Sequence, residues 1–373
     1  GTMVDESGTQ GSWLYSIFCA AVPFAWLALP AIPKARILTY TPTVVVCVLL
    51  SLFLQPTSTL LVLVGLIAYT VGSYNSAPVP PPRAYDVKVE GKEDGEILFF
   101  MHGWPDNSTV WSKNVEFFRK EYKCITFTLP NFNDREPARK VNPWGYDEDH
   151  IVASIAITLK QQLKAAGKDK VVLVSHDWGA IFAASLVLQH PEMIKSVVYI
   201  DVKKDPLINS FILNMVFGFV YMYWIILAFL IQGLPYIGEP IADYMIGSMS
   251  SKMSVGRHPP RDIPATAACG YPYFYMHLRG FQEKLGILRP FKARHGITNL
   301  PQVKTLFIYA KDKPFMFHLP KAEKELKERK DGSKVVGIGE KKEGEKPKIG
   351  HWLQYYGSDI FNEELDNFLK DPN

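Results

Sequence analysis

Short apolar runs alternate with longer amphipathic stretches along most of the chain. The runs rich in β-branched and aromatic residues are predicted to be buried strands, at Ile97–Met101, Cys124–Leu129, Val171–Ser175, Ser196–Ile200 and Thr305–Tyr309. The stretches between and after them predict helices over Val110–Tyr122, Glu148–Ala166, Gly179–Gln189 and Lys321–Lys330, and a last strand over Lys334–Ile338. Strands separated by such helices indicate βα units. The expected fold class is α/β, with a mainly parallel sheet and helices on both faces.

The alternation stops after the fourth strand. Residues 201–291 are predicted to form a mostly helical insertion that lies over the core as a lid. The core itself is then expected in two parts, residues 79–200 and 292–373. Residues 1–78 have a different character, because their only charged side chains are Asp5, Glu6, Lys34 and Arg36.

Two apolar stretches fill the N-terminal part, Trp13–Pro33 and Thr43–Val71, and no charged residue occurs between Ile37 and Pro82. A bilayer core of about 30 Å is crossed by roughly 20 apolar residues. We therefore expect an N-terminal membrane anchor of one or two helices. The alternative is a helical hairpin buried against another protein.

A third uncharged run, Phe211–Ile231, lies inside the predicted lid. If it spanned a bilayer, the two parts of the core would lie on opposite sides, so a helix in the membrane surface is favoured. The glycosylation acceptor Asn107–Thr109 overlaps the expected active-site entrance, where a glycan would obstruct access. We therefore expect a cytosolic catalytic domain on the endoplasmic reticulum or another internal membrane, with membrane lipid as a partner.

Composition narrows the class of protein. The chain is 47% hydrophobic and 21% charged, and its 41 basic and 37 acidic residues leave a net charge of only +4. This balance excludes a disordered chain and predicts no nucleic-acid partner. The charge-rich tract of residues 321–348 mixes both signs and is expected to be a solvated surface. The four cysteines form no paired framework, which favours a reducing compartment.

The segment Val171–Ala180 carries the strongest chemical signal. A strand runs into a turn and then a helix, and the small residues Ser175 and Gly179 lie two positions either side of Asp177. This spacing is typical of a nucleophile elbow, in which a tight turn projects its central side chain from the end of the sheet. Esterases and lipases have serine there. A carboxylate in its place can attack an electrophilic carbon and form an ester.

A second motif, His102–Pro105, ends an earlier strand. The backbone N–H of Trp104, with that of Trp178, is expected to form an oxyanion hole for hydrolysis of the ester. His102 and Pro105 are expected to contribute to substrate binding.

His351, near the C-terminus, supplies a base that titrates near neutrality. Its orienting acid is predicted to be Asp312, just past a strand, with Asp201 as the rival.

Together, these motifs resemble the epoxide hydrolases of the α/β-hydrolase fold, to which haloalkane dehalogenases are related. The resemblance implies that Asp177 opens the epoxide, that two lid tyrosines protonate the departing oxygen, and that His351 with its acid activates the water that frees the diol. It points to Tyr275, in the segment Gly270–Tyr275, as one tyrosine. The other is expected to be Tyr223, with Tyr221 and Tyr236 as alternatives.

The resemblance therefore implies an enzyme that opens lipophilic small-molecule epoxides to vicinal diols. It implies no metal and no organic cofactor. A haloalkane dehalogenase is the alternative enzyme, because it uses the same nucleophile and often a tryptophan in the position of Trp178. A non-catalytic membrane scaffold is the alternative of another class.

Overall fold

The computed structural model describes residues 65, 68–70, 72–77, 79–132, 142–202, 221–234, 236–252, 260–261, 263–286, 303–313, 316–318, 320–340 and 348–371. The chain divides into two compact units, one of residues 1–78 and 230–242 and the other of residues 79–229 and 243–373. The predicted membrane helix over Trp13–Pro33, most of the one over Thr43–Val71 and residues 211–220 of the third apolar run lie outside the described residues. Among the residues that are described, no helix is both long and apolar enough to cross a bilayer.

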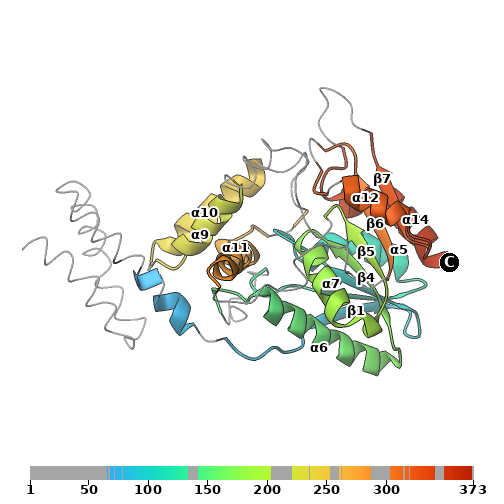
Figure 1. Cartoon of the computed structure of the whole chain (residues 1–373), viewed down its shortest axis with the longest axis horizontal. Coiled ribbons are helices and arrows are strands. Elements are labelled where there is room, and N and C mark those ends of the chain that lie inside the picture. Colours follow the sequence, from blue (N-terminus) through green and yellow to red (C-terminus); the bar gives the residue numbers. More distant parts are fainter. Residues whose placement is uncertain are drawn as a thin grey trace, which may run out of the picture. The chain divides into compact units, whose positions relative to one another are not determined.

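The second unit contains a seven-stranded sheet in the order β1-β3-β2-β4-β5-β6-β7 (Figure 1). Its strands are β1 (Val87–Gly91), β2 (Ile97–Met101), β3 (Lys123–Phe127), β4 (Val171–His176), β5 (Ile194–Ile200), β6 (Lys304–Ala310) and β7 (Lys334–Ile338). Strand β1 pairs antiparallel with β3, and every other neighbouring pair is parallel. The mainly parallel sheet is thus confirmed. The edge strand β1 was not predicted, because its alternating charged residues leave it only partly buried.

Helices cover both faces of this sheet (Figure 1). The described helices of the core are η1 (Ser108–Trp111), α5 (Ser112–Phe118), α6 (Glu148–Ala166), α7 (Trp178–Gln189), η3 (Pro191–Met193), α12 (Pro320–Lys327), α13 (Leu353–Tyr356) and α14 (Ser358–Lys370). On one face, Leu98 and Phe100 of β2 pack in a cluster with Phe118 of α5 and Phe361 of α14. Helices α6 and α7 lie against the other face.

Local chemistry sets several boundaries. Helix α6 begins after Asp147, whose carboxylate accepts a hydrogen bond from the His150 N–H, and it ends at Gly167 in the left-handed region at φ 61°. Its bounds match the predicted range. The helix predicted over Val110–Tyr122 is instead a 3-10 turn followed by the shorter α5.

The described part of residues 221–286 is helical, with α9 (Tyr223–Ile231), α10 (Gly238–Lys252), η5 (Ala267–Gly270) and α11 (Tyr271–Lys284). Gly270 allows the start of α11 to approach α9, because a Cβ there would lie 2.9 Å from Ile225 Cγ2. The rings of Phe229 and Phe274, 5.2 Å apart, continue this contact. The predicted lid boundaries at residues 201 and 291 remain predictions.

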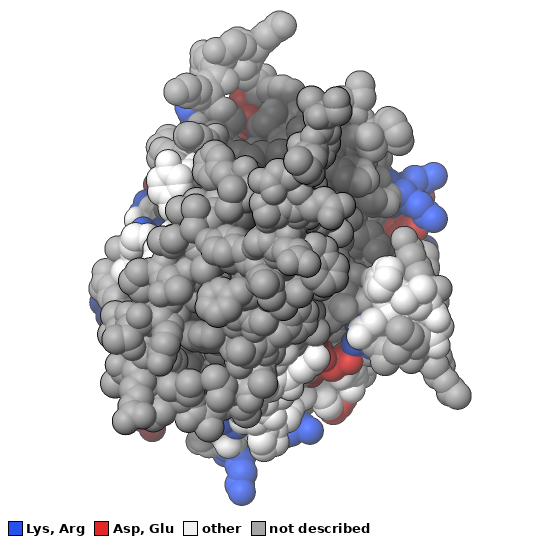
Figure 2. All heavy atoms as spheres, turned by 90° about the vertical axis from the view of Figure 1, so that its left-hand side faces the viewer, with Lys and Arg blue, Asp and Glu red and all other residues white. Residues whose placement is uncertain are grey.

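Strands β2, β4, β5 and β6 are parallel, so their carboxyl ends meet at one edge of the sheet. The residues just after these four strands include the predicted site residues His102, Asp177, Asp201 and Asp312. On the face shown in Figure 2, the described Lys and Arg side chains lie at separate places around the rim, with no single basic patch among them.

Candidate active site

Asp177 occupies a strained turn between β4 and α7, with φ 52° and ψ −121°. Two glycines permit this geometry. A Cβ on Gly179 would lie 2.3 Å from the Met101 carbonyl oxygen, and a Cβ on Gly103 would lie 2.5 Å from Asp177 Oδ1. A non-glycine residue at positive φ costs free energy and marks a functional turn. The backbone is therefore that of the predicted elbow, with its carboxylate side chain 16% exposed.

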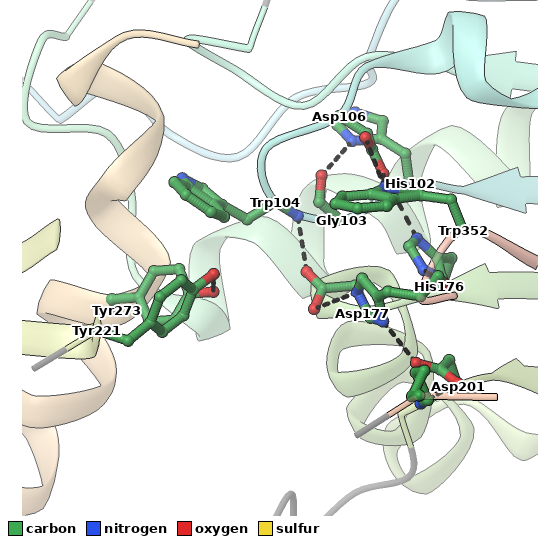
Figure 3. Close-up of polar contacts among 12 residues, drawn as sticks. His102, Gly103, Trp104, Asp106, His176, Asp177, Asp201, Tyr221, Tyr273 and Trp352 are labelled. Carbon is green, nitrogen blue, oxygen red and sulfur yellow. Dashed lines mark hydrogen bonds and ion pairs between the residues drawn. The ribbon is translucent and has the colours of Figure 1, made fainter. Parts of the chain in front are cut away.

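The Asp177 carboxylate is held from two sides (Figure 3). The Trp104 N–H donates a hydrogen bond of 2.7 Å to Oδ1, while Oδ2 lies 3.5 Å from His351 Nε2. Burial by itself raises the pKa of Asp177, but His351, His176 and the backbone N–H of Trp178 more than offset it, so the pKa lies below its usual value. The carboxylate is thus ionised and in contact with both predicted oxyanion-hole N–H groups.

Asp201, which follows β5 directly, is the carboxylate in contact with His351 Nδ1. Its Oδ2 lies 2.5 Å from His351 Nδ1, and its Oδ1 accepts a hydrogen bond from the Lys313 ammonium. Both side chains of this ion pair are fully buried. The geometry therefore places Asp201, and not the preferred Asp312, against the His351 ring.

Asp312 serves the same loop in another way. Its carboxylate accepts hydrogen bonds of 2.8 to 3.0 Å from the backbone N–H groups of Lys348, Ile349 and Gly350. These residues lead directly into His351, so Asp312 fixes the backbone just before that histidine. The three hydrogen bonds involve backbone N–H groups and not the His351 ring. Both carboxylates follow neighbouring strands, which explains why the sequence alone did not separate their roles.

The two flanking carboxylates set the charge of His351. Burial lowers the pKa of this imidazole, but hydrogen bonds and charge from Asp177 and Asp201 raise it to about 9. Burial raises the pKa of Asp201 in turn, and Lys313 with His351 more than offsets that, so its pKa lies below the usual range. With no ligand bound, His351 is therefore an imidazolium between two carboxylates at neutral pH.

Two tyrosines from the helical part of the chain lie together across from Asp177 (Figure 3). The hydroxyls of Tyr221 and Tyr273 are 3.1 Å apart. The Trp104 ring packs edge-on against both, at centroid distances of 5.8 Å and 5.7 Å, and Trp178 lies 5.0 Å from Tyr273. Burial, followed by other charges such as that of Asp177, raises the pKa of both phenols, so they remain protonated.

The predicted pair, Tyr223 and Tyr275, lies elsewhere. Tyr223 is 48% exposed and its ring packs 5.2 Å from His277, while the ring of Tyr275 packs 5.3 Å from Phe274. Each lies two residues beyond the tyrosine that is placed near Asp177, and two residues turn an α-helix by about 200°. The structure thus brings the alternative Tyr221, and Tyr273 in place of Tyr275, near Asp177, and the preferred side chains point to another side. Only the packing of the helices reveals which face is turned inward.

His102, predicted to bind substrate, instead holds the oxyanion turn. It is fully buried, its Nε2 accepts from the Leu129 N–H at 3.0 Å, and its Nδ1 donates to the Gly103 carbonyl at 3.0 Å. Burial lowers its pKa to about 4, so the ring is neutral. Pro105 is buried and its carbonyl accepts a hydrogen bond from Arg261. These contacts give both residues a structural part in the turn.

Three further buried residues, His176, Trp352 and Asp106, are linked by contacts next to His351. His176 Nε2 donates a hydrogen bond of 3.0 Å to the His351 carbonyl. Trp352 Nε1 donates to Asp106 at 2.9 Å, and Asp106 lies 3.5 Å from His176 Nδ1. Asp106 and Lys313 were not identified from the sequence.

Among the described residues, no group of three His, Cys, Asp or Glu side chains is arranged to hold a metal ion.

Comparison with known proteins agrees with the fold. The family model for the alpha/beta hydrolase fold matches residues 96–224. Epoxide hydrolase 1 of Caenorhabditis elegans is 24% identical over 114 residues, which are 31% of this chain and 27% of that protein. Epoxide hydrolase 2 of Siraitia grosvenorii is 32% identical over 109 residues, or 29% of this chain and 33% of that protein. The chain thus matches about a third or less of the length of these curated relatives.

Solved structures with the same fold include enzymes of more than one activity. A mutant epoxide hydrolase from Bacillus megaterium, complexed with its diol product, has a TM-score of 0.50 at 18% identity and covers 77% of this chain and 96% of its own. An esterase from Exiguobacterium antarcticum has a TM-score of 0.52 at 16% identity, with 76% and 95% covered. At such identities the likeness shows the fold alone. The chain therefore has the α/β-hydrolase fold and is distantly related to epoxide hydrolases.

Proposed function

We propose that the chain is an epoxide hydrolase that converts lipophilic epoxides to vicinal diols through an alkyl ester on Asp177. One observation carries the proposal: an aspartate occupies the elbow, and a hydrogen-bonded pair of tyrosines, Tyr221 and Tyr273, packs on the tryptophans beside it. The carboxylate supplies a nucleophile for carbon, and the phenols supply the proton that an opening ring needs. The distant epoxide hydrolase relatives support the same reading.

In the first step, Asp177 attacks a ring carbon of the epoxide. Oδ1 accepts a hydrogen bond of 2.7 Å from the Trp104 N–H, whereas the contact of Oδ2 with His351 Nε2 is longer, at 3.5 Å, so Oδ2 is the oxygen that forms the new bond. The carbon–oxygen bond of the ring breaks, and the departing oxygen takes a proton from Tyr221 or Tyr273. Because burial keeps both phenols protonated, a donor is present when the ring opens.

In the second step, His351 takes a proton from water, and the hydroxide attacks the ester carbonyl. Esterification removes the negative charge of Asp177, which is one of the two charges that raise the pKa of His351. The imidazolium then loses its proton more easily, this proton restores the phenol that gave one up in the first step, and His351 becomes the base when the base is needed. The N–H groups of Trp104 and Trp178 stabilise the oxyanion. Its collapse breaks the bond between the carbonyl carbon and the alkoxy oxygen, and that oxygen takes the proton from His351 and leaves as part of the diol.

The test is product analysis with three probes. Purified full chain is expected to form a diol from styrene oxide, faster than it releases bromide from n-butyl bromide or nitrophenol from p-nitrophenyl acetate. Bromide release as the main activity would indicate a dehalogenase, since halide needs no proton donor. Ester cleavage alone would indicate an esterase, and a chain inert to all three would be a scaffold.

The preference for lipophilic substrates has its own test. The rate of diol formation is expected to be higher with a long-chain alkyl epoxide than with a short one.

Membrane attachment is a further part of the proposal. It rests on the uncharged stretch between Ile37 and Pro82 and on the apolar run Phe211–Ile231. The sedimentation of the full chain with phospholipid vesicles is expected to fall when residues 3–72 are deleted. Unchanged binding would exclude the N-terminal part as the anchor.

The two candidate acids are separated by matched substitutions. Asp201→Asn is expected to slow hydrolysis of the ester by about tenfold to a hundredfold, because the imidazolium loses its charged partner. Asp312→Asn removes an ionic acceptor of three backbone N–H groups, so we expect a lower melting temperature with nearly normal turnover of folded protein. Rates are normalised to folded protein by circular dichroism. A rate loss for Asp312→Asn alone would restore Asp312 as the acid.

A further inference from the structure

A buried ammonium lies behind the proposed acid. Lys313 is 0% exposed, although lysine side chains are almost never fully buried unless they are paired. Its Nζ contacts Asp201 Oδ1, and the other oxygen of the same carboxylate contacts His351 Nδ1. Lysine, aspartate and histidine therefore form one continuous chain of contacts that ends at the nucleophile.

The apolar surroundings strengthen this coupling. The ring of Phe317 lies 5.0 Å from Lys313 Nζ and 5.2 Å from the His351 ring, so it covers both cations. The Asp201 side chain is fully buried as well. Charges separated from water in this way interact more strongly than they would at the surface.

Two cations thus share one carboxylate. A carboxylate that served His351 alone would stabilise the imidazolium strongly and hold the base protonated after Asp177 has been esterified. The ammonium of Lys313 offsets part of that negative charge and repels the imidazolium. Its own pKa is lowered by burial, which the Asp201 carboxylate opposes.

We propose that Lys313 is a positioning residue for the second step, which holds Asp201 and limits its charge so that His351 can act as a neutral base on the ester. This inference rests on the proposed function and extends it to a fully buried residue that acts through Asp201. Among the described residues, the other charged or titratable groups that face His351 are Asp177, which becomes neutral in the ester, and His176, whose ring is 4.5 Å away. The buried His318 interacts with Lys313 and Asp201. Asp106 faces His176 from the far side, and Asp312 adds a carboxylate near Lys313.

The test compares Lys313→Gln with Lys311→Met in the full chain, using styrene oxide. Glutamine retains a donor toward Asp201 but removes the charge, whereas Lys311 is an exposed lysine of the same turn. Quenched single turnovers separate formation of the ester from its hydrolysis. For Lys313→Gln we expect the acidic limb of the hydrolysis rate to move up by about one pH unit and hydrolysis at pH 7 to slow about tenfold. Ester formation should change less than about twofold, and Lys311→Met should match the unmodified protein.

A second readout does not depend on turnover. In protein labelled with nitrogen-15 histidine, the His351 signals, assigned with His351→Gln, should titrate at higher pH in Lys313→Gln and in Lys313→Met than in the unmodified chain. Lys313→Arg, which keeps the charge, should restore the original titration. If the chain proves inactive on epoxides, the proposed function fails while this titration still tests the coupling.

Three outcomes would overturn the inference. One is an unchanged titration of His351 in both neutral variants. Another is a uniform loss of hydrolysis at every pH, which a purely structural lysine would produce. The last is loss of the folded state in both neutral variants, seen by circular dichroism while Lys311→Met stays folded, because Lys313 would then be needed for the fold itself.

Discussion

Replacement of His351 by Gln is expected to trap the substrate as an ester on the protein. Asp177 attacks carbon without help from a base, so the first step survives the substitution. The second step needs a group that takes a proton from water, and glutamine does not, so hydrolysis should slow by about 10²- to 10⁴-fold. Intact-protein mass spectrometry with styrene oxide should show one added substrate mass, and peptide mapping should locate it on Asp177.

The matched control is Asp177→Asn in the His351→Gln background, which removes the nucleophile and should abolish the adduct. Heavy-oxygen water gives the same mechanism a second test. In one turnover of the unmodified chain, water attacks the ester carbonyl, so the label should enter the Asp177 carboxylate and the diol should keep an oxygen from the protein. Label in the first-turnover diol, with none on Asp177, would mean that water attacks the epoxide directly.

The double substitution Tyr221→Phe with Tyr273→Phe is expected to slow ester formation by about 10²- to 10⁴-fold. The departing oxygen would leave as an alkoxide without a proton donor, while both aromatic rings and their packing on Trp104 are kept. Each single substitution should cost less, because the hydroxyls are 3.1 Å apart and one can serve in place of the other. Single-turnover rates of adduct formation measure the effect.

The control for this prediction is the double variant Tyr223→Phe with Tyr275→Phe. It removes two hydroxyls, each two residues beyond one of the test pair, at positions whose rings pack against His277 and Phe274. Its rate of ester formation should stay within about threefold of normal. If the control loses as much activity as the test variant, the proton donors are not the tyrosines beside Trp104.

The elbow and the oxyanion turn were predictable because their requirements are local. A strand that must turn sharply into a helix needs small residues beside the projecting side chain, and Gly179 has no room for a Cβ against Met101. Likewise, the sheet followed from runs of apolar residues, because burial on both faces leaves no polar positions in a parallel strand. Only the edge strand Val87–Gly91, exposed and charged, escaped this rule.

The identity of the partners was decided by tertiary structure. Asp201 and Asp312 follow neighbouring strands. The sequence does not show that the backbone N–H groups before His351 bind Asp312, whereas the His351 imidazole contacts Asp201. The tyrosines differ in the same way, since a shift of two residues reverses the side of a helix and only helix packing decides which side is inward. The sequence by itself thus determined the fold and the elbow that carries Asp177, which depend on neighbours along the chain. The placement of Asp201 against His351, the pairing of Tyr221 with Tyr273 and the burial of Lys313 depend on contacts between segments far apart in sequence, and those exist only once the chain has folded.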